Sequence, residues 1–338
     1  MTIQDAIARA VSGGSLTEVE MFAVMGRLMD GEGTPAQIAG LLTALCIKGE
    51  TADELVGAAR AMRARMTPLS VPGPVVDTCG TGGDGLATFN VSTAAALIAA
   101  GAGVAVAKHG NRAASGRVGG ADVLEALGVA IDLPPAGVAR CLAAAGIGFC
   151  FAPRFHAAMR FAATPRREIG IRTILNLLGP LANPAGAEAQ LVGVFAVQWT
   201  DVVADALRRL GTRRALVVHG ADGLDEISAA GPTLVSEVAE GSVRTYHLHP
   251  SDFGVTPTGP APRAADATAS AAIVRGVLAG AAGAARELAL VNAAAVLVVA
   301  GLAADWRDGY ERAARAIARG AAAEALARLV ATSQAVAV

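Results

Sequence analysis

The residues with the clearest chemistry form a glycine-rich stretch, Asp77–Thr93, which reads DTCGTGGDGLATFNVST. Four glycines lie within Gly80–Gly85, directly after the apolar pair Val75 and Val76 and before an Ala-rich helical pattern. Backbone N–H groups of such a loop can converge on one ligand, because no Cβ blocks its approach. The helix that follows adds its positive N-terminal end. Strand, glycine loop and helix start together predict a phosphate-binding site.

The spacing Gly80-x-Gly82-x-x-Gly85 also matches the dinucleotide-binding fingerprint, which expects an acidic residue about 20 positions further on. The chain instead reaches a cation, Lys108, in the sequence KHGNR. The loop also lacks the Gly-Lys-Ser/Thr ending of a nucleotide-binding P-loop. NAD binding is therefore disfavoured, and a plain tight turn is the structural alternative.

A second glycine-containing loop, Lys108–Asp122, reads KHGNRAASGRVGGAD and begins at the end of a predicted strand. In open α/β sheets, that edge is where ligands bind. Lys108, Arg112 and Arg117 in such a loop favour a multiply charged phosphate ester. The alternative is a basic loop that merely faces water.

Three arginines, Arg166, Arg167 and Arg172, lie in the otherwise apolar segment PRREIGIRTILNLLGPLANP. A guanidinium group there can hold a carboxylate with two parallel hydrogen bonds. For Arg167 and Arg172, a surface ion pair with Glu168 or a helix cap is an equally good interpretation.

Adjacent carboxylates, Asp225 and Glu226, follow the apolar run LVVH in the sequence GADGLDE. Carboxylates at the carboxyl end of a strand suit Mg²⁺, which prefers oxygen ligands and keeps several waters. An exposed turn is the alternative, since Asp and Gly favour turns. A neighbouring diphosphate site strengthens the metal interpretation, because a metal ion would bridge the two.

The first 66 residues are predicted to be helical. Thr17, Thr34 and Thr51 each stand three positions before Glu or Gln, the pattern of a capping box. From Val75 onward, short β runs alternate with helical patterns, which predicts an α/β fold with a mostly parallel sheet flanked by helices. The predicted strands are Val75–Cys79, Val104–Lys108, Gly148–Ala152, Leu191–Ala196 and Ala215–His219, with a hairpin at Thr233–His249. The predicted helices of this part are Ser92–Ala100, Ala121–Leu127, Ala136–Ala145, Phe155–Thr164 and Asp201–Leu210, followed by a helical tail from Ala267 to Thr332.

Composition limits the classes of partner. The net charge of the 338 residues is −1, which implies no general attraction to nucleic acid or to acidic membranes. The apolar stretches Val91–Ala107 and Ala289–Ala304 contain polar or small residues and favour buried elements over membrane spans. The start MTIQDAIARA lacks the layout of a signal peptide, and the four cysteines lack zinc-site spacing. We therefore expect a cytoplasmic protein with reduced thiols.

Taken in order, GTGGDG, NVST, KHGNR, GGADVLEALG, NLLGPLANP and DGLDE resemble the anthranilate phosphoribosyltransferase family over nearly the whole chain. The resemblance implies transfer of 5-phosphoribosyl from PRPP to the amino group of anthranilate, in tryptophan biosynthesis. It also implies a helical domain of residues 1–72 plus roughly 172–188, an α/β domain of residues 73–171 and 189–338, and a homodimer formed through the helical domain. Two rivals stay open: a pyrimidine nucleoside phosphorylase of the same fold, disfavoured by the paired acids, and a non-catalytic nucleic-acid-binding relative, disfavoured by the net charge.

The resemblance also implies residue roles. Lys108, Asn111 and Arg166 match the catalytic positions, and Gly80, Asn111 and Arg166 the anthranilate contacts. Ser92, Asp225 and Glu226 match the Mg²⁺ ligands. The matching PRPP contacts are Gly80, Gly83, Asp84, Thr88, Asn90, Val91, Ser92, Thr93, Lys108, His109, Gly110, Asn111, Arg112, Ala113, Ala114, Ser115, Gly116 and Gly120.

The chain departs from the family pattern in the second loop. Gly116, Val118 and Gly120 occupy positions that often carry serine. This departure removes hydroxyl contacts to phosphate, although backbone N–H contacts can remain. Asp84 is an unusual residue beside a phosphate, and we expect it to face ribose hydroxyls or metal-bound water.

Overall fold

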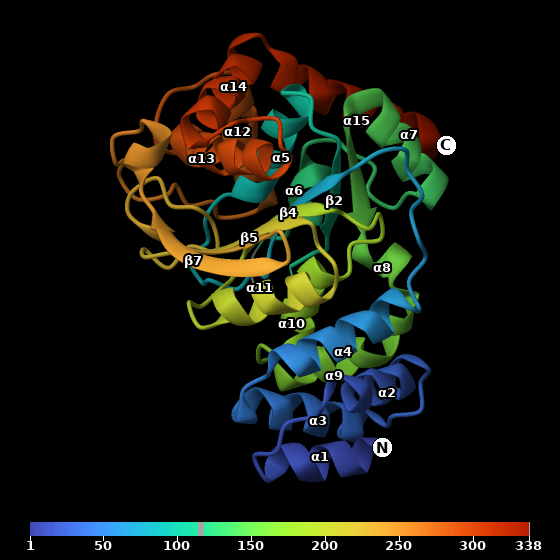
Figure 1. Ribbon diagram of the computed structural model, residues 1–338. Coiled ribbons are helices and arrows are strands. Elements are labelled where there is room, and N and C mark those ends of the chain that lie inside the picture. Colours follow the sequence, from blue (N-terminus) through green and yellow to red (C-terminus); the bar gives the residue numbers. More distant parts are fainter. Residues whose placement is uncertain (114–117, 338) are drawn as a thin grey trace.

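The chain begins with a helical bundle that forms one end of the molecule (Figure 1). The computed structural model describes residues 1–113 and 118–337. The capping boxes predicted at Thr17, Thr34 and Thr51 are confirmed, since each threonine side chain and its N3 partner bond reciprocally. The helices of the bundle are α1 (Ile3–Val11), α2 (Glu18–Met29), α3 (Pro35–Lys48) and α4 (Ala52–Arg63).

The rest of the chain is built on one mixed sheet. Within the described residues its strand order is β3-β2-β1-β4-β5-β6-β7, in which the first five strands are parallel and the last two pair antiparallel. The strands are β1 (Val76–Gly80), β2 (Val106–Gly110), β3 (Ile147–Phe151), β4 (Ala189–Gly193), β5 (Arg214–Gly220), β6 (Thr233–Ala239) and β7 (Ser242–Leu248). The predicted strands and the hairpin are confirmed, with ends shifted by up to three residues.

Helices cover both faces of the sheet (Figure 1). Alternate residues of one strand enter different cores: in β5, Leu216 and Val218 face the C-terminal helices, whereas Ala215 and Val217 face α11 and the bundle. The core that contains Ala215 and Val217 therefore joins this face of the sheet to the helical bundle. The covering helices are α5 (Val91–Gly101), α6 (Gly120–Ala126), α7 (Pro135–Ala145), α11 (Trp199–Arg209), α12 (Ala267–Leu278), α13 (Ala284–Val299), α14 (Trp306–Ala318) and α15 (Ala321–Ala337), with a 3₁₀ turn, η3, at Pro250–Phe253.

The segment between β3 and β4 differs from the prediction. Instead of one helix at Phe155–Thr164, the chain forms α8 (Ala152–Phe155), η1 (Ala157–Met159), α9 (Arg160–Ile169), α10 (Ile174–Leu178) and η2 (Gly179–Leu181). Proline in a helix interior loses one N–H bond, so Pro165 is a sequence signal for a helix end. Here α9 continues through it, with Pro165 buried while the helix packs against α2 and α3. The prediction of this helix was therefore wrong at both ends.

No helix among the described residues is both long and apolar enough to cross a membrane.

Candidate active site

The candidate site lies at the carboxyl edge of the sheet, beside β1. The chain runs from β1 outward through β2 to β3, and then returns to pair β4 with the other side of β1. Ligands of open α/β sheets bind at such a change of direction, outside the strand ends. Gly80 and Gly193 end their strands in register there, and a cavity of about 1290 Å³ opens in front of them.

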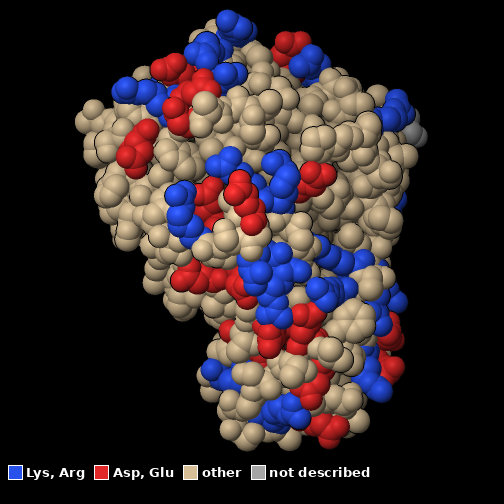
Figure 2. Space-filling model, in the orientation of Figure 1, with Lys and Arg blue, Asp and Glu red and all other residues tan. Residues whose placement is uncertain are grey.

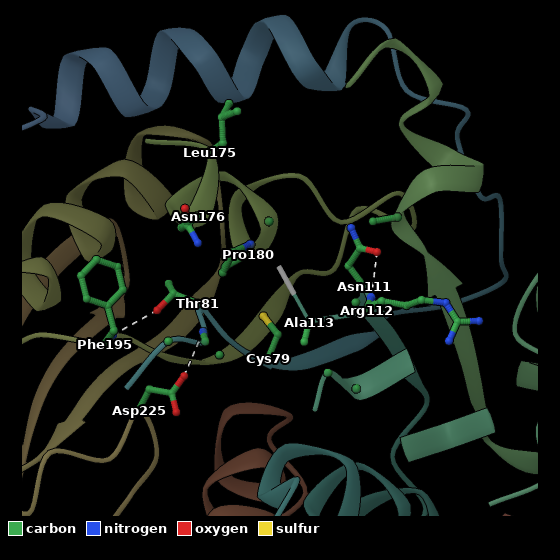
Figure 3. Close-up of a pocket in the computed structure, with 18 of the residues that line it drawn as sticks. Cys79, Thr81, Asn111, Arg112, Ala113, Leu175, Asn176, Pro180, Phe195 and Asp225 are labelled. Carbon is green, nitrogen blue, oxygen red and sulfur yellow. Dashed lines mark hydrogen bonds between the residues drawn. The ribbon is translucent and has the colours of Figure 1, made fainter. Parts of the chain in front are cut away.

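Two walls face each other across this cleft (Figure 3). Cys79, Thr81 and Asp225 come from the sheet side, whereas Leu175 and Asn176 come from α10 on the side of the helical bundle. Residues after five different strands therefore meet a helical wall that carries both apolar and polar side chains.

Most of the predicted site residues meet in this one cleft. Thr93 is not among its lining residues: it is buried behind Asn90, whose Oδ1 accepts a hydrogen bond from the Thr93 N–H at 3.0 Å. Ala114, Ser115 and Gly116 lie outside the described residues. The predicted residues that line the cleft are Gly80, Gly83, Asp84, Thr88, Asn90, Val91, Ser92, Lys108, His109, Gly110, Asn111, Arg112, Ala113, Gly120, Arg166, Asp225 and Glu226.

The start of α5 and the end of β2 bring positive charge to the cleft. Asn90 caps α5, so the helix presents its positive end at the cleft. Lys108 is only 2% exposed, and its Nζ donates to the Thr78 carbonyl at 2.6 Å and to Ser92 Oγ at 3.1 Å. Burial lowers the pKa of Lys108, while the nearby carboxylate Asp77 opposes that shift.

Acidic side chains converge on the other side of the glycine loop. Asp225 Oδ2 accepts a hydrogen bond from the Gly82 N–H at 3.0 Å, and a Cβ added to Gly80 would lie 2.5 Å from that same oxygen (Figure 3). Burial, followed by the charge of Asp84, raises the pKa of Asp225 to about 7. Burial and the charge of Asp225 raise the pKa of Glu226 well above its ordinary value. Three acids therefore crowd one place where their negative charges oppose one another.

Arg166 and Asn111 are further polar residues that line the cleft. Arg166 is half-buried on α9, and burial lowers the pKa of its guanidinium. No salt bridge to it is found within residues 1–113 and 118–337. Asn111 Oδ1 accepts a hydrogen bond from the Arg112 N–H at 2.8 Å, and within residues 1–113 and 118–337 its amide nitrogen has no hydrogen-bond partner.

The predicted donor contact Arg112 is held by protein acids in this structure. Its guanidinium donates to Asp122 at 2.9 Å and to both Glu125 oxygens at 2.8 and 2.9 Å. Although Arg112 lines the cleft, these bonds direct its charge away from the cleft centre (Figure 3). The sequence did not predict these ion pairs, because both acids follow Arg112 by ten or more residues and no local spacing links them.

Two histidines lie together in the cleft, and only His109 was predicted there. The rings of His109 and His156 are 5.0 Å apart, and both side chains are buried. Burial lowers the pKa of His109 and lowers the pKa of His156 to about 3, so both are neutral near neutral pH.

Two further residues of the cleft, Thr81 in the glycine-rich stretch and Phe195, were not among the predicted site residues. Thr81 follows β1, and its Oγ1 accepts from the Phe195 N–H at 3.1 Å, just after β4 (Figure 3). Phe195 falls inside the predicted strand Leu191–Ala196, so the sequence offered no signal that it follows a strand end; the observed β4 ends at Gly193. Arg172, for which the sequence allowed an ion pair as an equal alternative, lines the cleft as well.

Known proteins resemble this chain along its whole length. The helical bundle domain of a glycosyl transferase family matches residues 4–66, and the a/b domain of that family matches residues 72–323. A protein called anthranilate phosphoribosyltransferase from Moorella thermoacetica is 55% identical over 327 residues, which cover 96% of each chain.

Solved structures are similar too. The crystal structure of anthranilate phosphoribosyltransferase from Thermus thermophilus superposes with a TM-score of 0.90 at 45% identity, over 98% of this chain and 99% of that one. The enzyme from Saccharomyces cerevisiae in complex with PRPP and Mg has a TM-score of 0.88 at 26% identity, over 98% of both chains. The same yeast enzyme has also been solved with 4-fluoroanthranilate.

Proposed function

The chain belongs to the anthranilate phosphoribosyltransferase family, and from that membership we propose how its cleft performs the reaction. The reaction transfers the 5-phosphoribosyl group of PRPP to the amino group of anthranilate. Its products are N-(5-phosphoribosyl)anthranilate and diphosphate, and it belongs to tryptophan biosynthesis. The observation that carries the proposal is the single cleft in which Lys108, Arg166 and the pair Asp225 and Glu226 meet.

We assign the donor to the positive end of α5 and to the end of β2. Bond breaking leaves charge on diphosphate, and the buried ammonium group of Lys108 lies where it can stabilise that charge. Its hydrogen bond to Ser92 Oγ also orients the hydroxyl group at the helix start. Thr93 does not face the cleft, and its N–H donates to Asn90 Oδ1, which caps the start of α5.

The acids Asp225 and Glu226 suit a divalent cation. Their raised pKa values indicate that the carboxylates are crowded and poorly solvated, and a cation would relieve that repulsion. Among the described residues, no group of three His, Cys, Asp or Glu side chains could hold a metal by itself. The two acids and Ser92 would therefore share Mg²⁺ with the donor and water, as this ion usually requires. When bound, Mg²⁺ neutralises charge on the diphosphate.

Arg166 is proposed to hold the anthranilate carboxylate, with Asn111 as a second contact. Its guanidinium faces the cleft, is half-buried and lacks a protein acid among the described residues. A bidentate ion pair fixes the plane of the acceptor. An aromatic amine is already neutral and nucleophilic near neutral pH, so positioning matters more than removal of a proton.

The test is an assay that follows the loss of anthranilate fluorescence in the presence of PRPP and Mg²⁺. We expect turnover that requires all three components and that stops when EDTA removes the metal. A protein that consumes no anthranilate, or that splits nucleosides with inorganic phosphate instead, would contradict the proposal.

We further propose the domain division of residues 1–72 plus about 172–188 against 73–171 plus 189–338. Ile174 and Leu178 of α10 share one core with α2, α3 and α4, which supports the return of this segment to the bundle. Helix α9 (Arg160–Ile169) also packs against α2 and α3, so we extend the segment that returns to the bundle to begin near residue 160. Limited proteolysis should cut in Pro68–Pro74, and cuts within α9 would contradict the division.

A homodimer through the helical domain is proposed as well. Val11, Val19 and Ile47 are large apolar side chains of α1, α2 and α3 that are 73%, 78% and 82% exposed. Such exposure favours burial against a second copy. Light scattering should give twice the chain mass, and Ile47→Asp should shift the equilibrium toward monomer. A parent protein that is a monomer would contradict the dimer.

A cytoplasmic location is proposed too. All four cysteines are free, which supports it.

A further inference from the structure

Arg172 is a cleft cation that the proposed function leaves without a task. It follows Gly170 in the connection between α9 and α10 and is exposed to the cleft. The ion pair with Glu168 that its sequence position allowed is not formed, and no other acid pairs with Arg172 within residues 1–113 and 118–337.

The guanidinium of Arg172 is nevertheless held in place. Its Cζ lies 4.6 Å from the centre of the Phe195 ring, which is a cation–π distance. Phe195 is itself tied to the glycine loop, because its N–H donates to Thr81 Oγ1 at 3.1 Å (Figure 3). The ring therefore supports the charge from one side without neutralising it.

The glycine loop makes room for this side chain. A Cβ added to Gly83 would lie 2.8 Å from Nε of Arg172, so the arginine occupies the space that a side chain at residue 83 would take. Gly83 also has a φ of +84°, which favours glycine. The guanidinium thus lies directly against the loop whose Gly83 and Asp84 match donor contacts of the family.

From these contacts we infer that Arg172 is a donor-binding residue, whose guanidinium contacts an anionic phosphate group of PRPP at the Gly83 loop. The inference rests on the proposed function and adds a residue to it. A stacked guanidinium is already ordered, so little conformational entropy remains to be lost when the phosphate binds. It is weakly hydrated and carries five N–H donors, which suits a phosphate better than an ammonium does.

The connection that carries Arg172 gives this contact a second consequence. Arg172 enters the cleft from the connection between α9 and α10, and Arg166 enters it from α9, whereas Gly83 and Phe195 follow strands of the sheet. A phosphate held by Arg172 and by the glycine loop would join the two walls of the cleft. Donor binding would then fix α9, and with it Arg166, relative to the glycine loop.

The experiment measures PRPP binding by isothermal titration calorimetry with Mg²⁺ and without anthranilate, and then steady-state kinetics. The variants are Arg172→Gln, Arg172→Lys and Phe195→Leu. Arg167→Gln is the matched control, since Arg167 is an exposed arginine of the same segment that does not line the cleft. Thermal melting checks that each variant folds.

We expect Arg172→Gln to weaken PRPP binding about ten- to a hundredfold, the loss of one charge-assisted hydrogen bond. Arg172→Lys should recover part of that loss, Phe195→Leu should weaken binding severalfold, and Arg167→Gln should match the parent. The KM for anthranilate, measured at saturating PRPP, should change less than the KM for PRPP, measured at saturating anthranilate.

Two results would overturn the inference. One is a PRPP affinity of Arg172→Gln within about twofold of the parent, which is less than a hydrogen bond to a charged group contributes. The other is a loss confined to the KM for anthranilate. A parent protein that neither binds PRPP nor turns over would overturn the proposed function itself, and with it this assignment.

Discussion

Magnesium binding should depend on pH through Asp225. Its pKa is raised to about 7 by burial and by the charge of Asp84. A carboxyl group with that pKa is ionised in about 10% of molecules at pH 6 and about 90% at pH 8. Only the ionised form holds a cation, so the apparent dissociation constant for Mg²⁺ should fall about tenfold between these pH values.

The assay titrates Mg²⁺ at fixed PRPP and reads the rate of anthranilate consumption at pH 6, 7 and 8. The phosphates of PRPP also lose protons in this range, and Asp225→Asn reports their contribution separately. The variant should bind Mg²⁺ more weakly at pH 8, with a shallower pH dependence than the parent. Parallel pH profiles in the two proteins would refute the role given to Asp225.

The remaining predictions concern charge and stability in the same cleft. Arg166→Lys should raise the KM for anthranilate about tenfold or more while the KM for PRPP stays constant, because lysine cannot form the bidentate pair; equal KM values for anthranilate would contradict this in steady-state kinetics. Lys108→Met should lower kcat about a hundredfold or more, as expected when a group that stabilises developing charge is removed; a kcat near that of the parent would exclude the assignment. In the metal-free protein, Asp225 binds more protons folded than unfolded from about pH 4 to pH 7, so stability falls as pH rises through that window. Asp225→Asn should therefore melt several degrees higher than the parent at pH 8 and at the same temperature at pH 4, and a lower melting temperature at pH 8 would contradict the raised pKa.

Local signals predicted most of the fold. The threonine caps at Thr17, Thr34 and Thr51 act within one helical turn, so their pattern is visible in the sequence. The buried parallel strands read as short apolar runs for a similar reason. The segment from Ala152 to Leu181 was predicted poorly, because packing of α9 against the bundle overrides the stop signal of Pro165.

The site was predictable where motifs follow strands. Loops after β1, β2 and β5 meet at one edge by topology, which brought Gly80, Lys108 and Asp225 together as expected. Contacts that depend on side-chain packing were not predictable. The stacking of Arg172 on Phe195 joins residues that are distant in sequence and has no local pattern.

Surface charge is uninformative about this cleft. Figure 2 shows basic and acidic side chains interspersed over the visible face, in keeping with a net charge of −1. Binding of a polyanionic donor therefore depends on a few buried groups, such as Lys108, and on the N-terminus of α5.

The most direct test of the central claim is a crystal structure of this protein with PRPP, Mg²⁺ and an unreactive anthranilate analogue. We predict the donor diphosphate between the start of α5 and Lys108, the metal at Asp225 and Glu226, and the carboxylate of the analogue on Arg166. A donor bound elsewhere on the sheet, or a donor in the cleft with Asp84 and Asp225 both turned to solvent, would contradict the account.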